Sequence, residues 1–324
     1  MIGFLVQRLL QAVLVMAAMS VIVFVGVYAI GNPVDIVIPP EATQEIRAQT
    51  IQRLGLDRPL WEQYGIFLSN AFQGDLGRSF IYNIPVLELI GGRLPATLEL
   101  VLISVIGATV SGISLGVYAG YRPESLLARM IMAVSVLGFS VPTFWVGLIL
   151  ILVFAVNLGW LPAGGRGDTV MLWGIPWSFL TIDGLSHIVL PALNLALFKF
   201  AMMVRLARAG TREIMLTDTV KFARAAGISE RIIIRKHVLK LISIPIITVF
   251  GLELGSTLAF AVVTETIFSW PGVGKLIIDS IANLDRPVMV AYLLLTTLLF
   301  VMINLVVDLV FAVIDPRLRS RVAA

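Results

Sequence analysis

The sequence predicts an all-α integral membrane protein with six transmembrane helices and a small helical insertion between the first two. Of its 324 residues, 58% are apolar and 14% are charged, whereas about 25% are charged in a typical soluble domain. A helix needs about 20 apolar residues to cross a hydrocarbon core of roughly 30 Å. We expect the six spans at residues 9–30, 96–120, 130–157, 188–204, 241–264 and 288–314.

Composition also limits the chemistry of the chain. It has no cysteine and two histidines, so it has no disulfide framework and no cluster able to hold zinc. The net charge of +4 could suggest nucleic-acid binding, but the basic residues lie in short tracts that flank apolar runs. A membrane protein explains that distribution better.

The spans divide the chain into four parts. Residues 1–30 form an N-terminal transmembrane helix, 31–95 an extracytoplasmic helical loop, 96–314 a five-span core, and 315–324 a cytoplasmic tail. A cleaved signal peptide is the alternative for the first run, although the run is longer than the usual apolar region of about 7 to 15 residues.

The loop at 31–95 contains two amphipathic patterns, at 41–54 and 60–72, the second of which follows Pro59. We expect these helices to pack as a small cap outside the membrane. Seven acidic residues against five arginines between positions 31 and 94 agree with an outer location.

Two spans carry small residues at every fourth position, a pattern that predicts close helix packing within a membrane. The alternative is a chance spacing of glycines. The glycines of these two faces are Gly112, Gly116, Gly120, Gly251 and Gly255.

Polar residues are rare in the spans, and each is a candidate for the transport pathway or for structural hydrogen bonding. We single out Asn194, Glu253 and Asp308 as weak pathway candidates. Lys199 is expected to extend to the membrane interface. Pro142 interrupts the third span and predicts a kink there.

The segment 205–240 is the most basic part of the chain. It holds nine of the 24 Lys and Arg residues, about three times an even share, and such charge between spans belongs on the cytoplasmic side. Both termini then lie inside as well.

Arg166, in the outer loop that follows the third span, is expected to face Asp168 and Asp183.

Within this segment the sequence predicts a helix of about two turns. Asp218 is a good N-cap, Gly227 can end the helix in a left-handed conformation, and Ser229 then caps a second helix that runs to Lys240. A two-turn helix is marginal alone in water. It therefore needs a partner, unless it is a plain membrane-surface helix.

The chain lacks a phosphate-binding loop of its own. Gly274-Lys275 is the nearest approach to GxxxxGK[ST], but Ser269 and Leu276 stand where a glycine and a hydroxyl residue are required. We therefore expect a partner to supply any energy for transport.

The inner segment resembles the EAA loop of bacterial ABC importer permeases in its residues 221–227, KFARAAG, followed by Pro245. Lys221 and Phe222 replace the Glu and first Ala of that loop, and Lys240 stands where a proline is expected. Other stretches resemble the first-permease (B-type) branch of the dipeptide, oligopeptide and nickel group. They are LGLDRPL at 54–60, GDLGRS at 74–79, ETIFSWPG at 265–272 and DPR at 315–317.

This resemblance implies a type I ABC importer permease fold in the bacterial cytoplasmic membrane. It implies a coupling helix that rests on a cytoplasmic ATPase, formed by Asp218, Thr219, Val220, Lys221, Phe222, Ala223, Arg224, Ala225, Ala226 and Gly227.

The implied partners are a second homologous permease, met through the small-residue faces, two ATPases that hold the ATP and Mg, and an outer solute-binding protein. The chain itself would hold no cofactor or metal and would not be an enzyme.

The implied solute is a di- or oligopeptide, with a nickel chelate, glutathione, an opine or a sugar as alternatives. Two other classes of protein remain open on the residues alone. One is a membrane scaffold or sensor that docks a signalling protein on the inner loop. The other is a self-sufficient secondary transporter, which a lack of paired acids and bases in the spans argues against.

Overall fold

The computed structural model describes residues 2–29, 43–53 and 57–314. These residues are mostly helical, as predicted, but they also form a two-stranded antiparallel hairpin. The helical elements on the N-terminal side of that hairpin are α1 (Ile2–Ala29), α3 (Gln44–Arg53), α4 (Leu60–Phe72), α5 (Val86–Tyr121), α6 (Leu126–Ser140), α7 (Thr143–Leu150) and the π-helical turn η1 (Ile151–Asn157).

The hairpin strands are β1 (Val170–Leu172) and β2 (Ile175–Trp177), which correct the expectation of an all-α chain. The remaining helical elements are α8 (Ile182–Met215), α9 (Asp218–Ala225), α10 (Glu230–Ile233), the π-helical turn η2 (Ile234–Val238), α11 (Leu239–Ile267), α12 (Val273–Ala282) and α13 (Arg286–Ile314).

Within the described residues, five helical stretches are long and apolar enough to cross a membrane singly, and they coincide with five of the predicted spans. They lie in α1, α5, α8, the continuous run α10–η2–α11, and α13. Several of these helices extend past the apolar run: α8 continues through Arg205 to Met215. Much of the basic segment is therefore a helical extension of the spans.

The third predicted span is broken instead of kinked. Helix α6 and the run α7–η1 are bent by 113° at the break before Pro142. Val141 is extended there, with φ −101° and ψ 134°, as expected for a residue that precedes a proline. The described part of the chain thus reaches six candidate spans only if this bent pair is counted as one.

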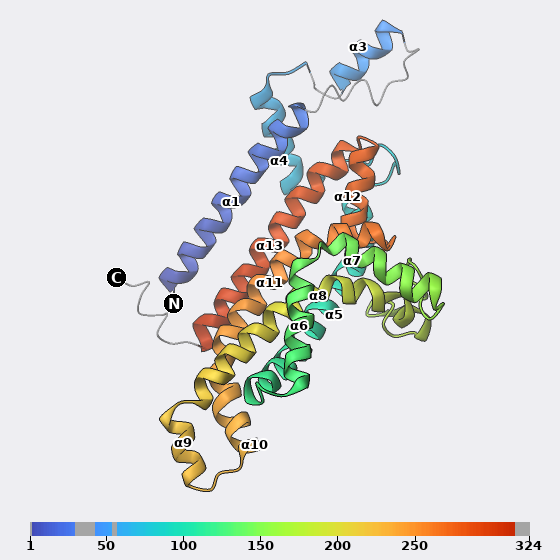
Figure 1. Ribbon diagram of the computed structural model, residues 1–324. Coiled ribbons are helices and arrows are strands. Elements are labelled where there is room, and N and C mark those ends of the chain that lie inside the picture. The colour runs from blue at the N-terminus through green and yellow to red at the C-terminus, as the bar shows by residue number, and fades with distance from the viewer. Residues whose placement is uncertain (1, 30–42, 54–56, 315–324) are drawn as a thin grey trace.

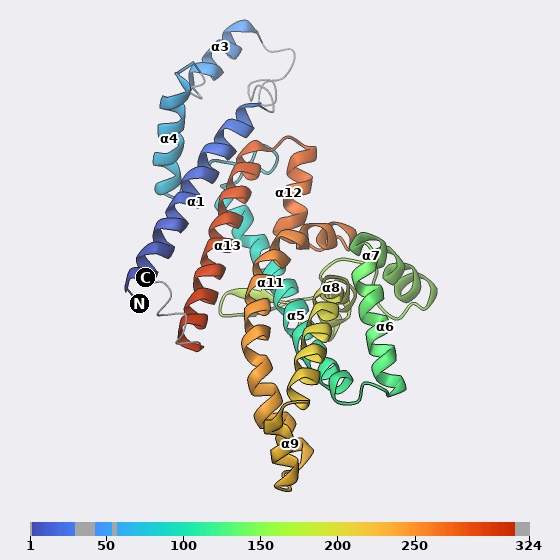
Figure 2. The same cartoon turned by 60° about the vertical axis from the view of Figure 1, so that its left-hand side comes forward.

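Helix α8 is central to the bundle and packs against α5, α6, α7 and α11 (Figure 2). Its most extensive contact is with α5, along the face predicted from Gly112, Gly116 and Gly120. A Cβ atom at Gly116 would lie 2.6 Å from the Val204 carbonyl oxygen. The glycines therefore let two backbones of the same chain approach closely.

The second glycine face also packs within the chain. Cβ atoms at Gly251 and Gly255 would meet the side chains of Val307 and Phe300 on α13. The expectation that these five glycines meet a second permease is therefore wrong, because α8 and α13 already fill the space beside them.

Helix α4 runs alongside α1 (Figures 1 and 2). The Tyr64 hydroxyl lies 2.8 Å from Ser20 Oγ, and Phe24 contacts both Tyr64 and Phe67. Ser20 and Phe24 belong to the apolar stretch Val6–Gly26 of α1. The aromatic stripe of α4 therefore packs onto a predicted span, which corrects the expectation of a cap. Residues 30–42, 54–56 and the tail at 315–324 lie outside the described residues.

The chain turns between α11 and α13 through the short helix α12. Trp270 is fully buried and its indole nitrogen donates to the Ala96 carbonyl oxygen at 2.8 Å. At the opposite end of the molecule, α9 and α10 project beyond the bundle (Figure 1). The first residues of α1 and the last of α13 lie toward that same end.

Candidate functional site

The inner loop joins two spans through the short helix α9. Helix α8 ends at Met215, α9 covers Asp218–Ala225, and the chain returns into α11 through α10 and η2 (Figure 1). Any displacement of α9 is thereby transmitted directly to two long helices.

The N-cap of α9 lies one residue before the predicted cap. Thr217 is the N-cap, and its carbonyl accepts the backbone N–H groups of Val220 and Lys221 at 3.1 Å. Its hydroxyl donates to the Ile214 carbonyl instead of capping the helix. Asp218 is the first helical residue, where its negative charge suits the positive end of the helix dipole.

The end of α9 agrees with the prediction. Gly227 has φ +74°, the left-handed region in which a side chain is strained. Its N–H donates to the Arg224 carbonyl and the N–H of Ile228 donates to the Ala223 carbonyl, both at 3.0 Å. This pair of bonds is a Schellman motif.

One face of α9 packs onto its own chain and the other is exposed. Val220 and Ala223 are buried with Ile233 of α10. Phe222 points away from this cluster and is 76% exposed. The exposed face of α9 therefore carries a large aromatic side chain that the apolar cluster beneath the helix does not use.

The charged residues of α9 are satisfied locally. Lys221, which stands where the resembled loop has a Glu, pairs with Asp218 at 2.8 Å. Arg224 pairs with Glu230 at 2.6 Å and so links α9 to α10. Ser229 is the N-cap of α10 by position, as predicted, but makes no side-chain cap bond.

The three pathway candidates lie in different parts of the bundle. Asn194 is fully buried and donates to Thr264 Oγ1 at 3.0 Å. Asp308 pairs with Arg8 of α1 at 3.0 Å, beside a crevice of about 230 Å³ between α1 and α13. Glu253 pairs with Lys199 of α8.

That last pair corrects two expectations. Lys199 is buried and does not extend to the interface. The spans do contain paired acids and bases, at Lys199–Glu253 and Arg8–Asp308. Both pairs join residues far apart in the sequence, so no local spacing could reveal them.

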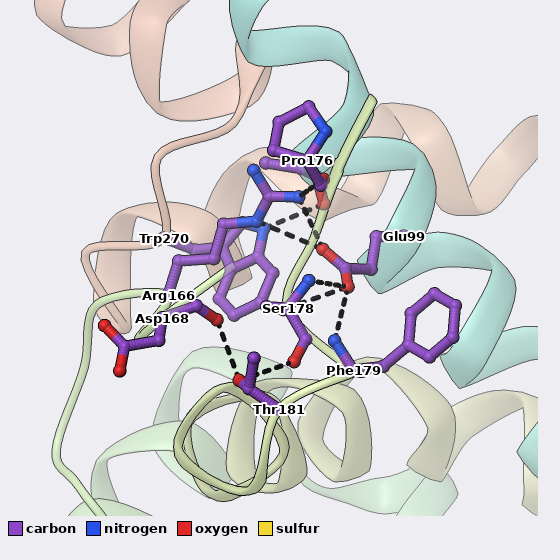
Figure 3. Close-up of polar contacts among 9 residues, drawn as sticks. Glu99, Arg166, Asp168, Pro176, Ser178, Phe179, Thr181 and Trp270 are labelled. Atoms are coloured by element: carbon purple, nitrogen blue, oxygen red, sulfur yellow. Dashed lines mark hydrogen bonds and ion pairs between the residues drawn. The ribbon is translucent and has the colours of Figure 1, made fainter. Parts of the chain in front are cut away.

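Sequence reasoning missed Glu99, which organises the outer loop (Figure 3). Its carboxylate accepts hydrogen bonds from the Ser178 backbone N–H at 2.7 Å, the Ser178 hydroxyl and the Phe179 N–H. It also forms an ion pair with Arg166 at 2.6 Å. Arg166 was expected to face Asp168 and Asp183, which instead bond to each other through the Asp168 N–H. The signal available was a lone acid at the start of a predicted span.

A second buried carboxylate explains the glycine of the stretch ETIFSWPG. Glu265 accepts from the Thr97 hydroxyl at 2.6 Å and from the Lys275 N–H at 2.9 Å, at the start of α12. A Cβ at Gly272 would lie 2.4 Å from this carboxylate. Only glycine fits there.

A third buried carboxylate holds the stretch GDLGRS. Asp285, between α12 and α13, accepts from the Ser79 hydroxyl and from the Phe80 N–H, the latter at 3.1 Å. This contact anchors the segment that enters α5. Two of the stretches that carry the resemblance, ETIFSWPG and GDLGRS, thus build the outer end of the bundle. The third, KFARAAG, forms most of α9 in the inner loop.

Residues 112–116, GISLG, also spell the GxSxG pattern of serine hydrolases. Ser114 lies inside α5 and donates to the Val110 carbonyl at 2.7 Å. A hydrolase nucleophile needs a sharp strand-to-helix turn, so these residues do not form a catalytic site. Their two glycines instead pack α5 against α8. Among the residues that the structure describes, no group of three His, Asp or Glu side chains could hold a metal ion.

The fold and the inner loop together define a membrane protein that packs long apolar helices around α8 and carries the short helix α9 at one end. Comparison with known proteins gives the family. Residues 112–320 match the binding-protein-dependent transport system inner membrane component, and residues 1–101 match the N-terminal region of such membrane components. The chain belongs to this family and is a permease component of a binding-protein-dependent importer.

Relatives cover the whole chain. It is 35% identical to the dipeptide transport system permease protein DppB of Alkalihalophilus pseudofirmus, over 98% of this chain and 100% of the relative. It is 37% identical to the glutathione transport system permease protein GsiC of Escherichia coli K12 and to the di/tripeptide permease DppB of Pseudomonas aeruginosa, each over 99% of this chain and 100% of the relative.

A solved structure of an inward-facing MetNI methionine ABC transporter is similar in fold. Its TM-score is 0.55 at 18% identity, and the alignment covers 71% of this chain and 97% of that one.

Proposed function

We propose that this permease moves di- or oligopeptides across the bacterial cytoplasmic membrane, through a pathway that it forms with a second, similar permease. Two relatives that carry dipeptide or di/tripeptide in their names support this class of solute. Glutathione, itself a tripeptide, is the second candidate because GsiC is as similar as either of them. An outer solute-binding protein would deliver the solute.

Two cytoplasmic ATPase subunits, which hold ATP and Mg, would drive transport by moving α9. The observation that carries this proposal is the two-faced packing of α9: Val220 and Ala223 are buried against α10, whereas Phe222 is 76% exposed. The exposed face is available to a partner, and α8 and α11 would transmit its movement. Helix α9 is then the coupling helix.

We infer a type I importer fold in which the bent pair α6–α7 counts as the third of six spans. Both termini would be cytoplasmic, because the first residues of α1 and the last of α13 lie toward the same end as the basic inner loop. The segment between α1 and α5 would lie on the outer side, with α4 lodged against α1 instead of standing free.

Substitution of Phe222 tests the coupling role. In the assembled transporter, Phe222→Ala should weaken the association with the ATPase by about 2 kcal/mol or more, the usual cost of losing an aromatic anchor. Both co-purified ATPase and dipeptide uptake by proteoliposomes should fall.

Leu126→Ala is the matched control, because Leu126 is 74% exposed at the start of α6 and belongs to no part of the inner loop. Normal uptake by the Phe222 variant would contradict the proposal. Loss of a signalling partner without any loss of uptake would favour a scaffold or sensor. Uptake by the permease alone under an ion gradient would favour a secondary transporter.

A further inference from the structure

The ion pair between Lys199 and Glu253 joins the two helices that flank the inner loop. Lys199 lies on α8 and Glu253 on α11, about midway along each helix. Ser256 stands beside both, since its hydroxyl lies 3.2 Å from Lys199 Nζ and 3.1 Å from Glu253 Oε2. The side chains of the pair retain 7% and 13% exposure.

This pair is less completely satisfied than the carboxylate of Glu99. Glu99 uses both oxygens, with three hydrogen bonds to Oε1 and an arginine on Oε2. For Glu253, the contacts made within the described part of the chain all reach Oε2. One carboxylate oxygen of Glu253 therefore has capacity for another donor.

The surroundings of the pair form a polar and aromatic strip on α6, α8 and α11. Lys199 Nζ lies 5.2 Å and 5.9 Å from the ring centres of Phe198 and Phe260. Phe198 stacks on Phe139 of α6 at 4.7 Å, and the Arg205 guanidinium lies 4.3 Å from the Phe139 ring. Phe260 and Phe139 are 66% and 47% exposed.

Membrane physics limits what this strip faces. A charge at the centre of a span costs about 2.5 to 3.5 kcal/mol on insertion scales, so charged groups in spans face protein or a water-filled cavity. A strip that carries an ion pair and a guanidinium is therefore unsuited to lipid. It suits a pathway shared with a second permease.

The other two candidates from the sequence do not share this setting. Asn194 is fully buried between α8 and α11. Asp308 is paired with Arg8 on the side of the bundle that α1 covers. The geometry thus separates Glu253 from the two residues with which it was grouped.

We propose that Lys199, Glu253 and Ser256 form a subsite for a zwitterionic solute in the translocation pathway. The carboxylate of a peptide binds Lys199 and its ammonium group binds Glu253, with Ser256 bridging them. When the subsite is empty, the two side chains neutralise each other, which avoids the large cost of an uncompensated buried charge. When a peptide fills the subsite, Lys199 exchanges the Glu253 carboxylate for that of the peptide, and Glu253 exchanges the Lys199 ammonium group for that of the peptide.

This subsite rests on the proposed transport of peptides and adds a basis for selectivity. A zwitterion replaces the internal ion pair with two pairs of the same kind. A neutral sugar has no charge to offer and would leave the internal pair intact. The subsite therefore favours peptides over neutral solutes.

A cysteine introduced at Ser256 tests whether the strip faces water, because the chain has no cysteine of its own. In the complete transporter, with cysteine-free partner subunits, Ser256→Cys should react with a water-soluble cationic methanethiosulfonate. Saturating dipeptide, delivered with the binding protein, should slow this reaction about tenfold, the factor expected for an occupied site at about 90% saturation. Leu14→Cys is the control. Leu14 is 68% exposed on α1, at the periphery of the bundle, and a thiol that faces lipid should not react with the water-soluble reagent.

A double neutralisation tests the charges without leaving one of them unpaired. Lys199→Met with Glu253→Gln should allow the transporter to co-purify intact but lower dipeptide uptake about tenfold or more, as expected for loss of a hydrogen bond to a charged group. The matched control is Arg8→Met with Asp308→Asn, which removes an ion pair on the α1 side. It should change uptake by about twofold at most.

The outcomes are separable. No reaction of the thiol at position 256, no protection by dipeptide, or equal loss of uptake in the two double variants would overturn the subsite while wild-type dipeptide uptake stands. Absence of dipeptide uptake by the wild-type transporter would overturn the proposed function and the subsite together.

Discussion

The outer and inner ends of the bundle are held by different chemistry. At the outer end, the buried carboxylates of Glu99, Glu265 and Asp285 each accept backbone N–H groups from a neighbouring segment. At the inner end, α9 is held by a small apolar cluster, and Phe222 remains exposed.

The two ends differ in the contacts that hold them in place. A buried carboxylate that loses its donors is costly, so such groups fix loops firmly. A two-turn helix is marginal by itself, and the cluster under α9 is small. The outer end is therefore held by contacts within the chain, whereas a partner completes the inner loop in the function that we propose.

The largest expected effect is at Glu99. Glu99→Leu would leave Arg166 without its carboxylate partner and two backbone N–H groups without their acceptor, which should destabilise the chain by about 3 to 5 kcal/mol. The measurement is the thermal unfolding of the purified chain in detergent. Glu124→Leu is the control, since Glu124 is 86% exposed in its ion pair with Arg129. Equal stability of the two variants would contradict the account of the outer end.

An intermediate effect is expected at Gly227. Gly227→Val places a branched side chain at φ +74°, which should cost about 1 to 2 kcal/mol. The loss is local, so backbone amides of α9 should exchange with solvent faster while those of α5 do not. Ala226→Val, at φ −79°, should have little effect. Equal exchange in both variants would show that the left-handed turn does not hold α9.

The smallest effect is expected at the ion pair between Arg224 and Glu230. Their side chains are 42% and 38% exposed, and exposed pairs contribute about 0 to 1 kcal/mol. Arg224→Gln should therefore shift the unfolding temperature of the purified chain only slightly. A loss as large as that in Glu99→Leu would mean that charge, and not the apolar cluster, holds the inner loop.

Structural features that depend on residues close together in the sequence could be predicted. Apolar runs located five spans, Pro59 located the start of α4, and Gly227 located the end of α9. The match to transport permeases confirmed the class of protein inferred from the resemblance.

Features that depend on distant residues could not be predicted. Glu99 and Arg166 are 67 positions apart, and Lys199 and Glu253 are 54 apart. The glycine pattern predicted close packing but did not identify the helix that packs there. Pro142 predicted a kink, but its angle of 113° depends on how both arms pack against α8.

The most direct test of the central claim is cross-linking from the exposed face of α9. With no native cysteine in the chain, Phe222→Cys gives a single reactive site there in the assembled transporter. A thiol-directed photo-cross-linker on this site should yield an adduct with the ATPase subunit, whereas the same label on Leu126→Cys should not. An intact, active transporter without an adduct at position 222 would contradict the claim that α9 is the docking element.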